Sequence, residues 1–348
     1  MHKLLKKKPL IIAEISANHN GNLSLAKKLI LSANKNGADA VKIQSYIPSS
    51  MTINSNKKEF IIKDGLWKNE KLWNLYKKAQ TPFEWHDKLF KFAKNNKINL
   101  FSTPFDNSAV DILEKLNCPF YKIASFEMTH LPLLKKIAKT NKTIILSTGM
   151  ANLSEIKTSY YFLKKNGAKD IIILYCVSNY PSKDKDFNLN NIKILINTFK
   201  CKVGFSDHSN NFEIAKCALA AGAEIFEKHY ALNNQTKGFD IKFSTKGKDL
   251  RKYKEALQYY NKLLGKQYFY RSKNEVSNKI FRRSIYAVKN IPKGTKFSKN
   301  NIKIIRPGYG ISPLNYFNLI NDGRSLVSIK KNTSLKWKYI KINNKKKY

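Results

Sequence analysis

Residues 10–44, LIIAEISANHNGNLSLAKKLILSANKNGADAVKIQ, contain the unit that decides the fold. The apolar run at 10–16 predicts a buried strand, and 23–37 have the lysine-rich amphipathic spacing of a helix. Gly37 falls just after this helix, where a left-handed C-cap would lie. A second apolar run begins at Ala40. Strand, helix and strand in this order predict a βα repeat built on a parallel sheet.

The same unit recurs through the first three quarters of the chain, and Gly167 and Gly222 take the position of Gly37 in later repeats. Eight such units predict a closed (β/α)8 TIM barrel. A doubly wound open sheet is the alternative, but eight regular units without a glycine-rich phosphate loop argue against it. The expected strands are 10–16, 40–44, 98–103, 120–125, 143–148, 170–176, 201–206 and 223–229.

The βα pattern stops near residue 265, and short strands with tight turns such as RPGYG take its place. We therefore expect a barrel domain over 1–265, a linker over 266–280 and a small β-rich domain over 281–345. The segment 45–97 is longer than one connection needs and is rich in aromatic residues, which is typical of a lid or substrate wall.

The formal net charge of +41 comes from lysines spread along the whole chain. Most fall between the apolar positions of the predicted helices, so they form solvated helix faces that could steer an anionic substrate. A polyanion or nucleic-acid binder is the competing interpretation. It predicts basic residues clustered with recognition motifs, and it leaves polar residues inside buried strands unexplained.

Four cysteines without a CxxC pair favour a reducing compartment. No stretch reaches the roughly 18 apolar residues that a membrane-spanning helix needs. The charged and apolar N-terminus lacks a cleavage site for secretion. The sequence therefore predicts a cytoplasmic protein without a membrane partner and without a specific nucleic-acid partner.

Polar residues lie in or at the end of six of the eight expected strands, where buried parallel strands should be apolar. His208 and His229 end strands seven and eight, and two imidazoles with open positions suit Mn²⁺, Fe²⁺, Co²⁺ or Zn²⁺. Lys42 and Lys122 suit anchoring of a phosphate or carboxylate, with a Schiff-base nucleophile as the alternative. Side chains gathered at the carboxyl ends of barrel strands indicate an active site.

The motifs EISANHNGN, VKIQSY, FSTPFD, YKIASFE, LSTGM, NYP, GFSDHS and EKHY resemble the sialic acid synthase family in order and spacing. RPGYG resembles that family's antifreeze-like (SAF) domain, and the resemblance covers about 10 to 340. His208 and His229 stand 21 residues apart, as the family's metal pair does. The resemblance implies an enzyme that condenses phosphoenolpyruvate with an N-acetylated amino sugar to give a nine-carbon 2-keto acid and phosphate.

The resemblance also implies a role for each matching residue. His208 and His229 would hold Mn²⁺, or a similar ion such as Mg²⁺ or Co²⁺, and Glu14 and Glu127 would guide a water or a proton. Arg306 would reach from the antifreeze-like domain of one subunit into its partner's active site, which implies a homodimer. Phosphoenolpyruvate would be bound by Lys42, Thr103, Lys122, Ser125, Ser147, Ser178 and Ser206. The sugar would be bound by Gln44, Tyr180, Asp240 and Arg306. The family commonly has Asn where Ser178 stands.

Within the family, the opening ISANHNG, the run TPFEWH and the ending RPGYGISP resemble the pseudaminic acid synthase branch. The implied acceptor is 2,4-diacetamido-2,4,6-trideoxy-L-altrose, and N-acetylneuraminate or legionaminate synthesis is the alternative within the family. Another phosphoenolpyruvate-dependent or Schiff-base aldolase on the same barrel also remains open. An aromatic wall from Tyr46, Phe83 or Trp85 is expected to pack on the acceptor's methyl group.

Overall fold

The computed structural model of the chain describes residues 4, 8–266 and 268–342. The chain divides into two compact units, Met1–Gly265 and Lys266–Tyr348. Parts of the expected domains lie outside the described residues, namely 1–3, 5–7, 267 and 343–345.

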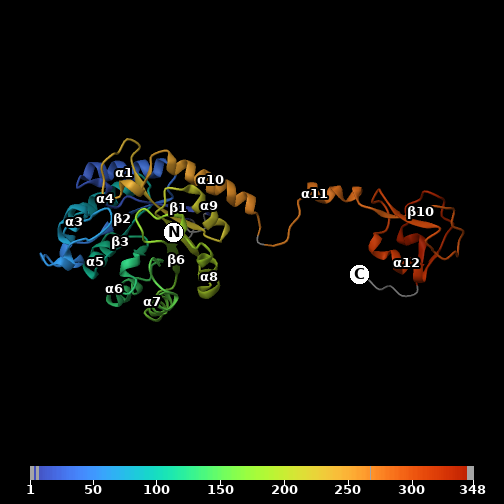
Figure 1. Ribbon diagram of the computed structural model, residues 1–348, viewed down its shortest axis with the longest axis horizontal. Coiled ribbons are helices and arrows are strands. Elements are labelled where there is room, and N and C mark those ends of the chain that lie inside the picture. Colours follow the sequence, from blue (N-terminus) through green and yellow to red (C-terminus); the bar gives the residue numbers. More distant parts are fainter. Residues whose placement is uncertain (1–3, 5–7, 267, 343–348) are drawn as a thin grey trace. The chain divides into compact units, whose positions relative to one another are not determined.

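Eight parallel strands form the sheet of the first unit, and β1 pairs with both β2 and β8, which closes it into a barrel (Figure 1). The (β/α)8 prediction is confirmed, because every expected strand overlaps an observed one. The strands are β1 (Leu10–Glu14), β2 (Ala40–Ser45), β3 (Leu100–Pro104), β4 (Tyr121–Ile123), β5 (Ile144–Ser147), β6 (Ile171–Cys176), β7 (Val203–Asp207) and β8 (Ile225–Ala231), with a short β9 (Thr245–Lys246) beside β8.

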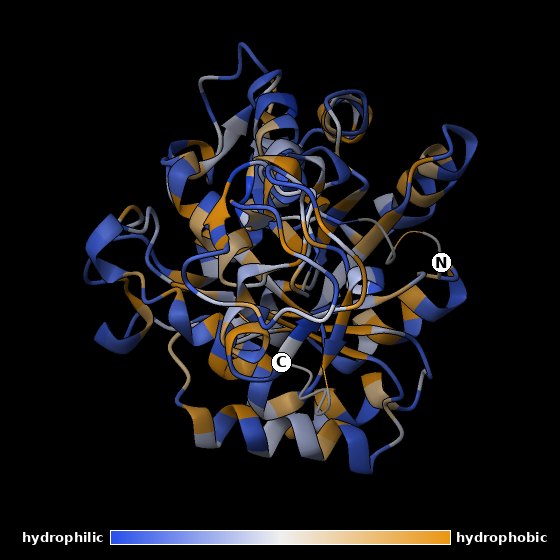
Figure 2. Ribbon diagram, turned by 90° about the vertical axis from the view of Figure 1, so that its right-hand side faces the viewer, coloured by the Kyte–Doolittle hydropathy of each residue, from blue (hydrophilic) through white to orange (hydrophobic). Residues whose placement is uncertain are grey.

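Helices cover the outside of this barrel, and hydrophobic and hydrophilic residues alternate along them as their amphipathic sequences predict (Figure 2). Asn22 caps the first helix by accepting from the backbone N–H of Leu25, and Gly37 beyond its end has φ +103°. The helices are α1 (Leu23–Lys35), α2 (Pro48–Met51), α3 (Leu72–Ala79), α4 (Phe83–Asn95), α5 (Asn107–Lys115), α6 (Leu131–Ala138), α7 (Leu153–Lys165), α8 (Asn190–Phe199), α9 (Phe212–Ala220) and α10 (Asp249–Leu264).

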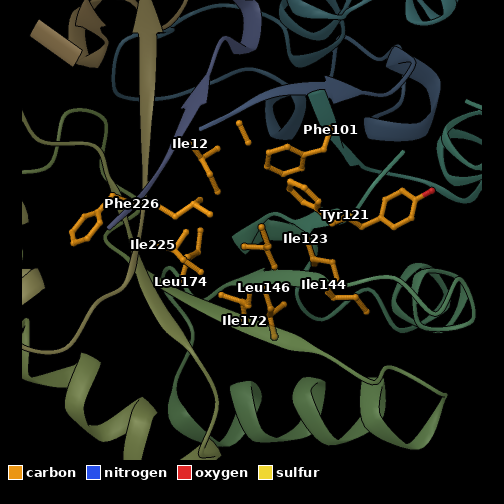
Figure 3. Packing of buried hydrophobic residues seen from close by; sticks show 14 of the residues in the cluster. Ile12, Phe101, Tyr121, Ile123, Ile144, Leu146, Ile172, Leu174, Ile225 and Phe226 are labelled. Carbon is orange, nitrogen blue, oxygen red and sulfur yellow. The ribbon is translucent and has the colours of Figure 1, made fainter. Parts of the chain in front are cut away.

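Buried aliphatic and aromatic side chains from all eight strands and from the helices form one hydrophobic cluster. Figure 3 shows part of it, with Ile12, Phe101, Leu174 and Ile225 coming from different strands. Burial of this size is the main favourable term in the stability of the barrel. It supports a rigid frame on which charged side chains at the strand ends can be held in fixed positions.

The second unit is small and β-rich, as expected. Two antiparallel pairs, β10 with β11 and β12 with β13, surround a core that includes Ile285, Phe297, Leu319 and Leu335. Its elements are α11 (Lys273–Ser277), β10 (Ser284–Ala287), β11 (Ile302–Ile305), α12 (Tyr316–Asp322), β12 (Gly323–Ser325) and β13 (Ile340–Ile342). None of the helices over 4, 8–266 and 268–342 combines the length and apolar character needed to cross a membrane.

Candidate active site

A buried network of four charged side chains joins β1, β2, β4 and β8 inside the barrel. The ammonium group of Lys42 lies 2.7 Å from Glu14 Oε2 and 3.0 Å from Glu227 Oε1. Lys122 lies 3.4 Å from the same Glu227 oxygen, and Ser206 donates to it over 3.2 Å. The strand order therefore brings together predicted residues from far apart in the sequence.

The four charges of this network balance, since two carboxylates face two ammonium groups. Burial alone lowers the pKa of Lys42, but Glu14 and Glu227 offset this and hold it above its ordinary value. Burial also lowers the pKa of Lys122, and the nearby Lys42 adds to the effect, while Glu227 offsets part of it. Burial alone raises the pKa of Glu227, yet Lys122 and Lys42 hold it well below its usual range. Glu227 is thus a fixed anion between two lysines.

The two predicted metal ligands lie side by side, with the rings of His208 and His229 5.5 Å apart. His208 Nδ1 lies 3.0 Å from the carbonyl oxygen of Val177, which places the proton on Nδ1 and leaves Nε2 as an acceptor. Burial, reinforced by His229, lowers the pKa of His208 to about 3, so the ring is neutral. His229 Nδ1 lies 3.4 Å from Asp240 Oδ2, but no hydrogen bond joins these two buried atoms.

The loop after β1 positions Asp240. Asn18 is fully buried, and its side-chain amide donates to the backbone oxygen of Tyr230 and to the Ser244 hydroxyl. Its carbonyl oxygen accepts from the backbone N–H of Asp240 over 3.2 Å. Asn18 therefore does more than shape its own turn, because it ties the end of β1 to the segment that follows β8.

Hydroxyl groups gather at the ends of β3 to β6. Among the described residues, Thr103 Oγ1 and Ser147 Oγ have no hydrogen-bond partner although both are buried. Ser125 Oγ accepts from the backbone N–H of Gly149 over 3.0 Å. A Cβ added at Gly149 would lie 1.9 Å from Ser178 Oγ and 2.9 Å from Ser125 Oγ. Ser178 Oγ, next to Gly149, also has no hydrogen-bond partner among the described residues. Buried hydroxyls that lack partners suit an anion with many oxygen acceptors.

A cavity of about 400 Å³ is lined by Ser178 and by both polar and apolar side chains. The polar lining residues come from segments in or next to the barrel strands and include Gln44, Glu127, Ser178, Tyr180, His229 and Asp240. Apolar residues come from the same region, with Phe105, Phe126, Phe239 and Phe243, and from the segment after β2, with Met51, Ile62, Trp67, Leu72, Leu75 and Tyr76. The segment 45–97 therefore lines a cavity, and its role as a substrate wall stays a prediction.

Two family profiles match this chain, and together they cover most of it. The profile of the NeuB family matches residues 29–268, and that of the SAF domain matches 282–341. The chain belongs to the NeuB family. It is 41% identical to the pseudaminic acid synthase of Campylobacter jejuni over 314 residues, 90% of this chain and 92% of that protein. It is also 41% identical to the N,N'-diacetyllegionaminic acid synthase of the same species, over 89% of this chain and 94% of that protein.

A solved NeuB-type structure agrees with the fold. The N-acetylneuraminic acid synthetase of Leptospira borgpetersenii superposes with a TM-score of 0.71 at 32% identity, covering 79% of this chain and 90% of that one. The resemblance to the sialic acid synthase family and the barrel-plus-SAF architecture are thus confirmed.

The histidine pair of this NeuB-family chain fits a divalent ion bound by two imidazoles. The His208 ring is held by the Val177 carbonyl oxygen and is neutral, as a ligand must be, and the His229 ring lies beside the Asp240 carboxylate. Within the described part of the chain, no set of three or more His, Cys, Asp or Glu side chains is placed to hold a metal ion. The remaining ligands would then come from substrate or water.

Some site residues were not anticipated from the sequence. Glu227 and Gly149 were missed, although Glu227 shares strand parity with His229 in IFEKH and Gly149 lies in LSTGM. Of the three aromatic residues expected near the acceptor's methyl group, Trp85 packs edge-on against His19, with centroids 5.5 Å apart. Among the described residues, the cavity wall includes Tyr46 but neither Trp85 nor Phe83. Arg306 is an exposed side chain of the second unit, and its role stays a prediction.

Proposed function

We propose that this chain is a pseudaminic acid synthase, which condenses phosphoenolpyruvate, 2,4-diacetamido-2,4,6-trideoxy-L-altrose and water to give pseudaminic acid and phosphate. The proposed type of reaction is supported by three features at the strand ends: a network of lysines and carboxylates, hydroxyls without hydrogen-bond partners, and a pair of imidazoles. The choice of acceptor rests on the similarity to pseudaminic acid synthases. Legionaminic acid synthesis is the second candidate, because the identity to that enzyme is equal.

Phosphoenolpyruvate would bind at the lysines and hydroxyls. Lys42 and Lys122 offer ammonium donors, while Thr103 and Ser147 offer hydroxyls that lack partners among the described residues. Charge-assisted hydrogen bonds of this kind are the strong ones for phosphate and carboxylate oxygens. Because Glu14 and Glu227 already neutralise the lysines, the network does not present a bare positive charge. The balanced network keeps both lysines fixed before the substrate arrives.

The acceptor sugar would place its aldehyde beside His229. A divalent ion held by His208 and His229, with Mn²⁺ as the candidate, would act as a Lewis acid on the aldehyde oxygen. Gln44, Tyr180 and Asp240 line the same cavity and would bind the hydroxyl and amide groups of the open-chain sugar.

The bond changes balance as follows. Carbon 3 of phosphoenolpyruvate bonds to the aldehyde carbon, whose oxygen gains a proton. Water adds to carbon 2, and the bond from carbon 2 to the phosphate oxygen then breaks while the new hydroxyl loses its proton and becomes the keto group. Glu14, which accepts from the backbone N–H of Ser16 and contacts Lys42, is a fixed carboxylate for orienting this water. Glu127 has its pKa raised by burial to about 7, so it can give or take a proton near neutral pH.

We further propose a homodimer in which Arg306 completes the sugar site of the partner subunit, as the family resemblance implies. The four cysteines form no disulfide, which suits the reducing conditions of the cytoplasm, where we place the reaction.

The function is tested by phosphate release from phosphoenolpyruvate in the presence of Mn²⁺. Three acceptors are offered separately: the diacetamido-altrose, the legionaminic acid precursor and N-acetylmannosamine. Turnover with the altrose, abolished by a chelator and restored by Mn²⁺, is the expected result. Preference for another acceptor would keep the mechanism and change the product, whereas release with none of them would overturn the proposal.

Replacing Glu127 by Gln is expected to stabilise the protein at pH 8 and to change its stability little at pH 4.5. The pKa of Glu127 is about 7 in the folded state against an ordinary value of 4.5. Between these values only the folded state holds the proton, so stability falls as pH rises through this window. Glutamine avoids the cost of a buried carboxylate, about 3 kcal/mol from the difference between these two pKa values. Denaturant unfolding at both pH values measures the difference, and a gain that does not depend on pH would contradict a raised pKa.

Replacing Gly149 by Ala is expected to raise KM for phosphoenolpyruvate at least about tenfold, as loss of a charged-group hydrogen bond does. The new methyl group would occupy the space beside Ser178 and Ser125 that we assign to the anion. Because the clashing atoms are hydroxyls that can rotate, the fold should survive. Steady-state kinetics with Ser178→Ala as a matched control tests this, since that variant loses the hydroxyl without filling the space. Unchanged KM in Gly149→Ala would place the anion elsewhere.

A further inference from the structure

Six apolar side chains that line the cavity come from α2, α3 and the segment between them, and we call Met51, Ile62, Trp67, Leu72, Leu75 and Tyr76 the apolar wall. Along α3 the lining residues Leu72, Leu75, Tyr76 and Ala79 recur at the spacing of one helix face. Asn74, Lys77 and Lys78 point outward and are exposed. The apolar stripe of this amphipathic helix therefore faces the cavity.

This stripe is not part of the barrel's interior packing. Over the residues that the structure describes, the hydrophobic core cluster includes none of the wall's six side chains. Tyr76 instead contacts Tyr46 edge-on, with centroids 5.8 Å apart, and Tyr46 contacts Phe105 in the same way. An apolar surface kept beside a substrate cavity is suited to apolar groups of the ligand.

We infer that the apolar wall binds the C6 methyl group of the acceptor and so selects 6-deoxy sugars; this inference rests on the proposed function. The aldehyde end must lie beside His229, which lines the same cavity as the apolar wall. The remainder of the open-chain sugar then extends from His229 into this cavity, where its far end meets the wall. A methyl group at C6 would be buried favourably against the wall. A hydroxyl at C6 would lose its hydrogen bonds to water and would find no hydrogen-bond partner on the wall.

The size of the expected preference for a 6-deoxy over a 6-hydroxy acceptor is bounded by what hydrophobic pockets achieve. A hydrophobic pocket rejects an analogue that adds one hydroxyl by about 100-fold at most. We therefore expect kcat/KM for the 6-deoxy diacetamido-altrose to exceed that for its 6-hydroxy counterpart by roughly 10- to 100-fold. The preference should not depend on the configuration at other carbons, so a 6-deoxy sugar of the legionaminic series should share it.

The test measures kcat/KM for this acceptor pair in the full chain and in three variants. Leu75→Ser and Ile62→Thr each place a hydroxyl on the wall, and both are expected to lower the preference by about tenfold, roughly the worth of one hydrogen bond. Lys77→Ser, on the outward face of the same helix, is expected to keep the preference of the unmodified protein.

The outcomes separate this inference from the proposed function. Equal turnover of the two acceptors by the unmodified protein, or an unchanged preference in both wall variants, would overturn the inference and leave the synthase activity standing. No phosphate release with either sugar would overturn both. Thermal unfolding of each variant distinguishes a change in preference from a loss of folded protein.

Discussion

Replacing Lys42 by Met is expected to destabilise the protein by about 3–5 kcal/mol and to abolish turnover. Lys42 contacts both carboxylates of the buried network, at 2.7 Å from Glu14 and 3.0 Å from Glu227. Without it Glu14 loses its only ammonium partner among the described residues and remains as a buried, uncompensated charge. Breaking a buried ion pair from one side costs far more than the pair contributes in net stability.

Lys122→Met provides the matched control. That variant removes an equally buried ammonium group, but Glu227 keeps Lys42 as a partner at 3.0 Å. We expect a much smaller loss of stability together with a KM for phosphoenolpyruvate raised by about 10²-fold. The double variant Lys42→Met/Glu14→Gln should recover part of the stability, because it removes both charges. Equal unfolding free energies for Lys42→Met and Lys122→Met, measured in denaturant, would contradict the network described above.

Much of this architecture could be predicted because each barrel strand is recognisable from its own short stretch of sequence. Polar residues such as Lys42 and His229 interrupt apolar runs, and their position at strand ends indicates an active site without any long-range information. The family motifs added roles for residues such as Tyr180 and Asp240. These residues do line one cavity, but the polar positions alone gave no reason to choose a sugar over another substrate.

What the sequence could not supply is pairing across the barrel. Glu227 is 185 residues from Lys42, and only the closure of β8 on β1 brings the two together. Lys228, one residue later, is also charged and buried, yet it faces away from the site and pairs with Asp207 at 3.1 Å. Because successive side chains on a strand point to opposite faces, Glu227 points to the site and Lys228 points away from it. Trp85 in α4 lies beside His19, and this contact between distant segments likewise cannot be read from the sequence.

Replacing His208 by Ala is expected to lower kcat by about 10³-fold while phosphoenolpyruvate still binds, since a Lewis acid on a carbonyl supplies several kcal/mol. His208 keeps Nε2 available as a ligand atom because Nδ1 is engaged by the Val177 carbonyl oxygen. The lysine network is built from other residues, so the first substrate should keep its anchor. Mn²⁺ binding, followed by calorimetry or by the electron paramagnetic resonance signal of free Mn²⁺, should weaken in parallel.

The matched control for this variant is His86→Gln. His86 is fully buried, and its ring nitrogens face Ser45 Oγ at 2.6 Å and the Pro82 carbonyl oxygen at 3.1 Å, away from the imidazole pair. Burial also lowers the pKa of His86, so the two variants remove rings of similar charge and environment. We expect His86→Gln to reduce stability and to leave Mn²⁺ affinity unchanged. If His208→Ala kept full Mn²⁺ affinity, the ion would have to bind elsewhere, and the 5.5 Å spacing of the two rings would then reflect packing alone.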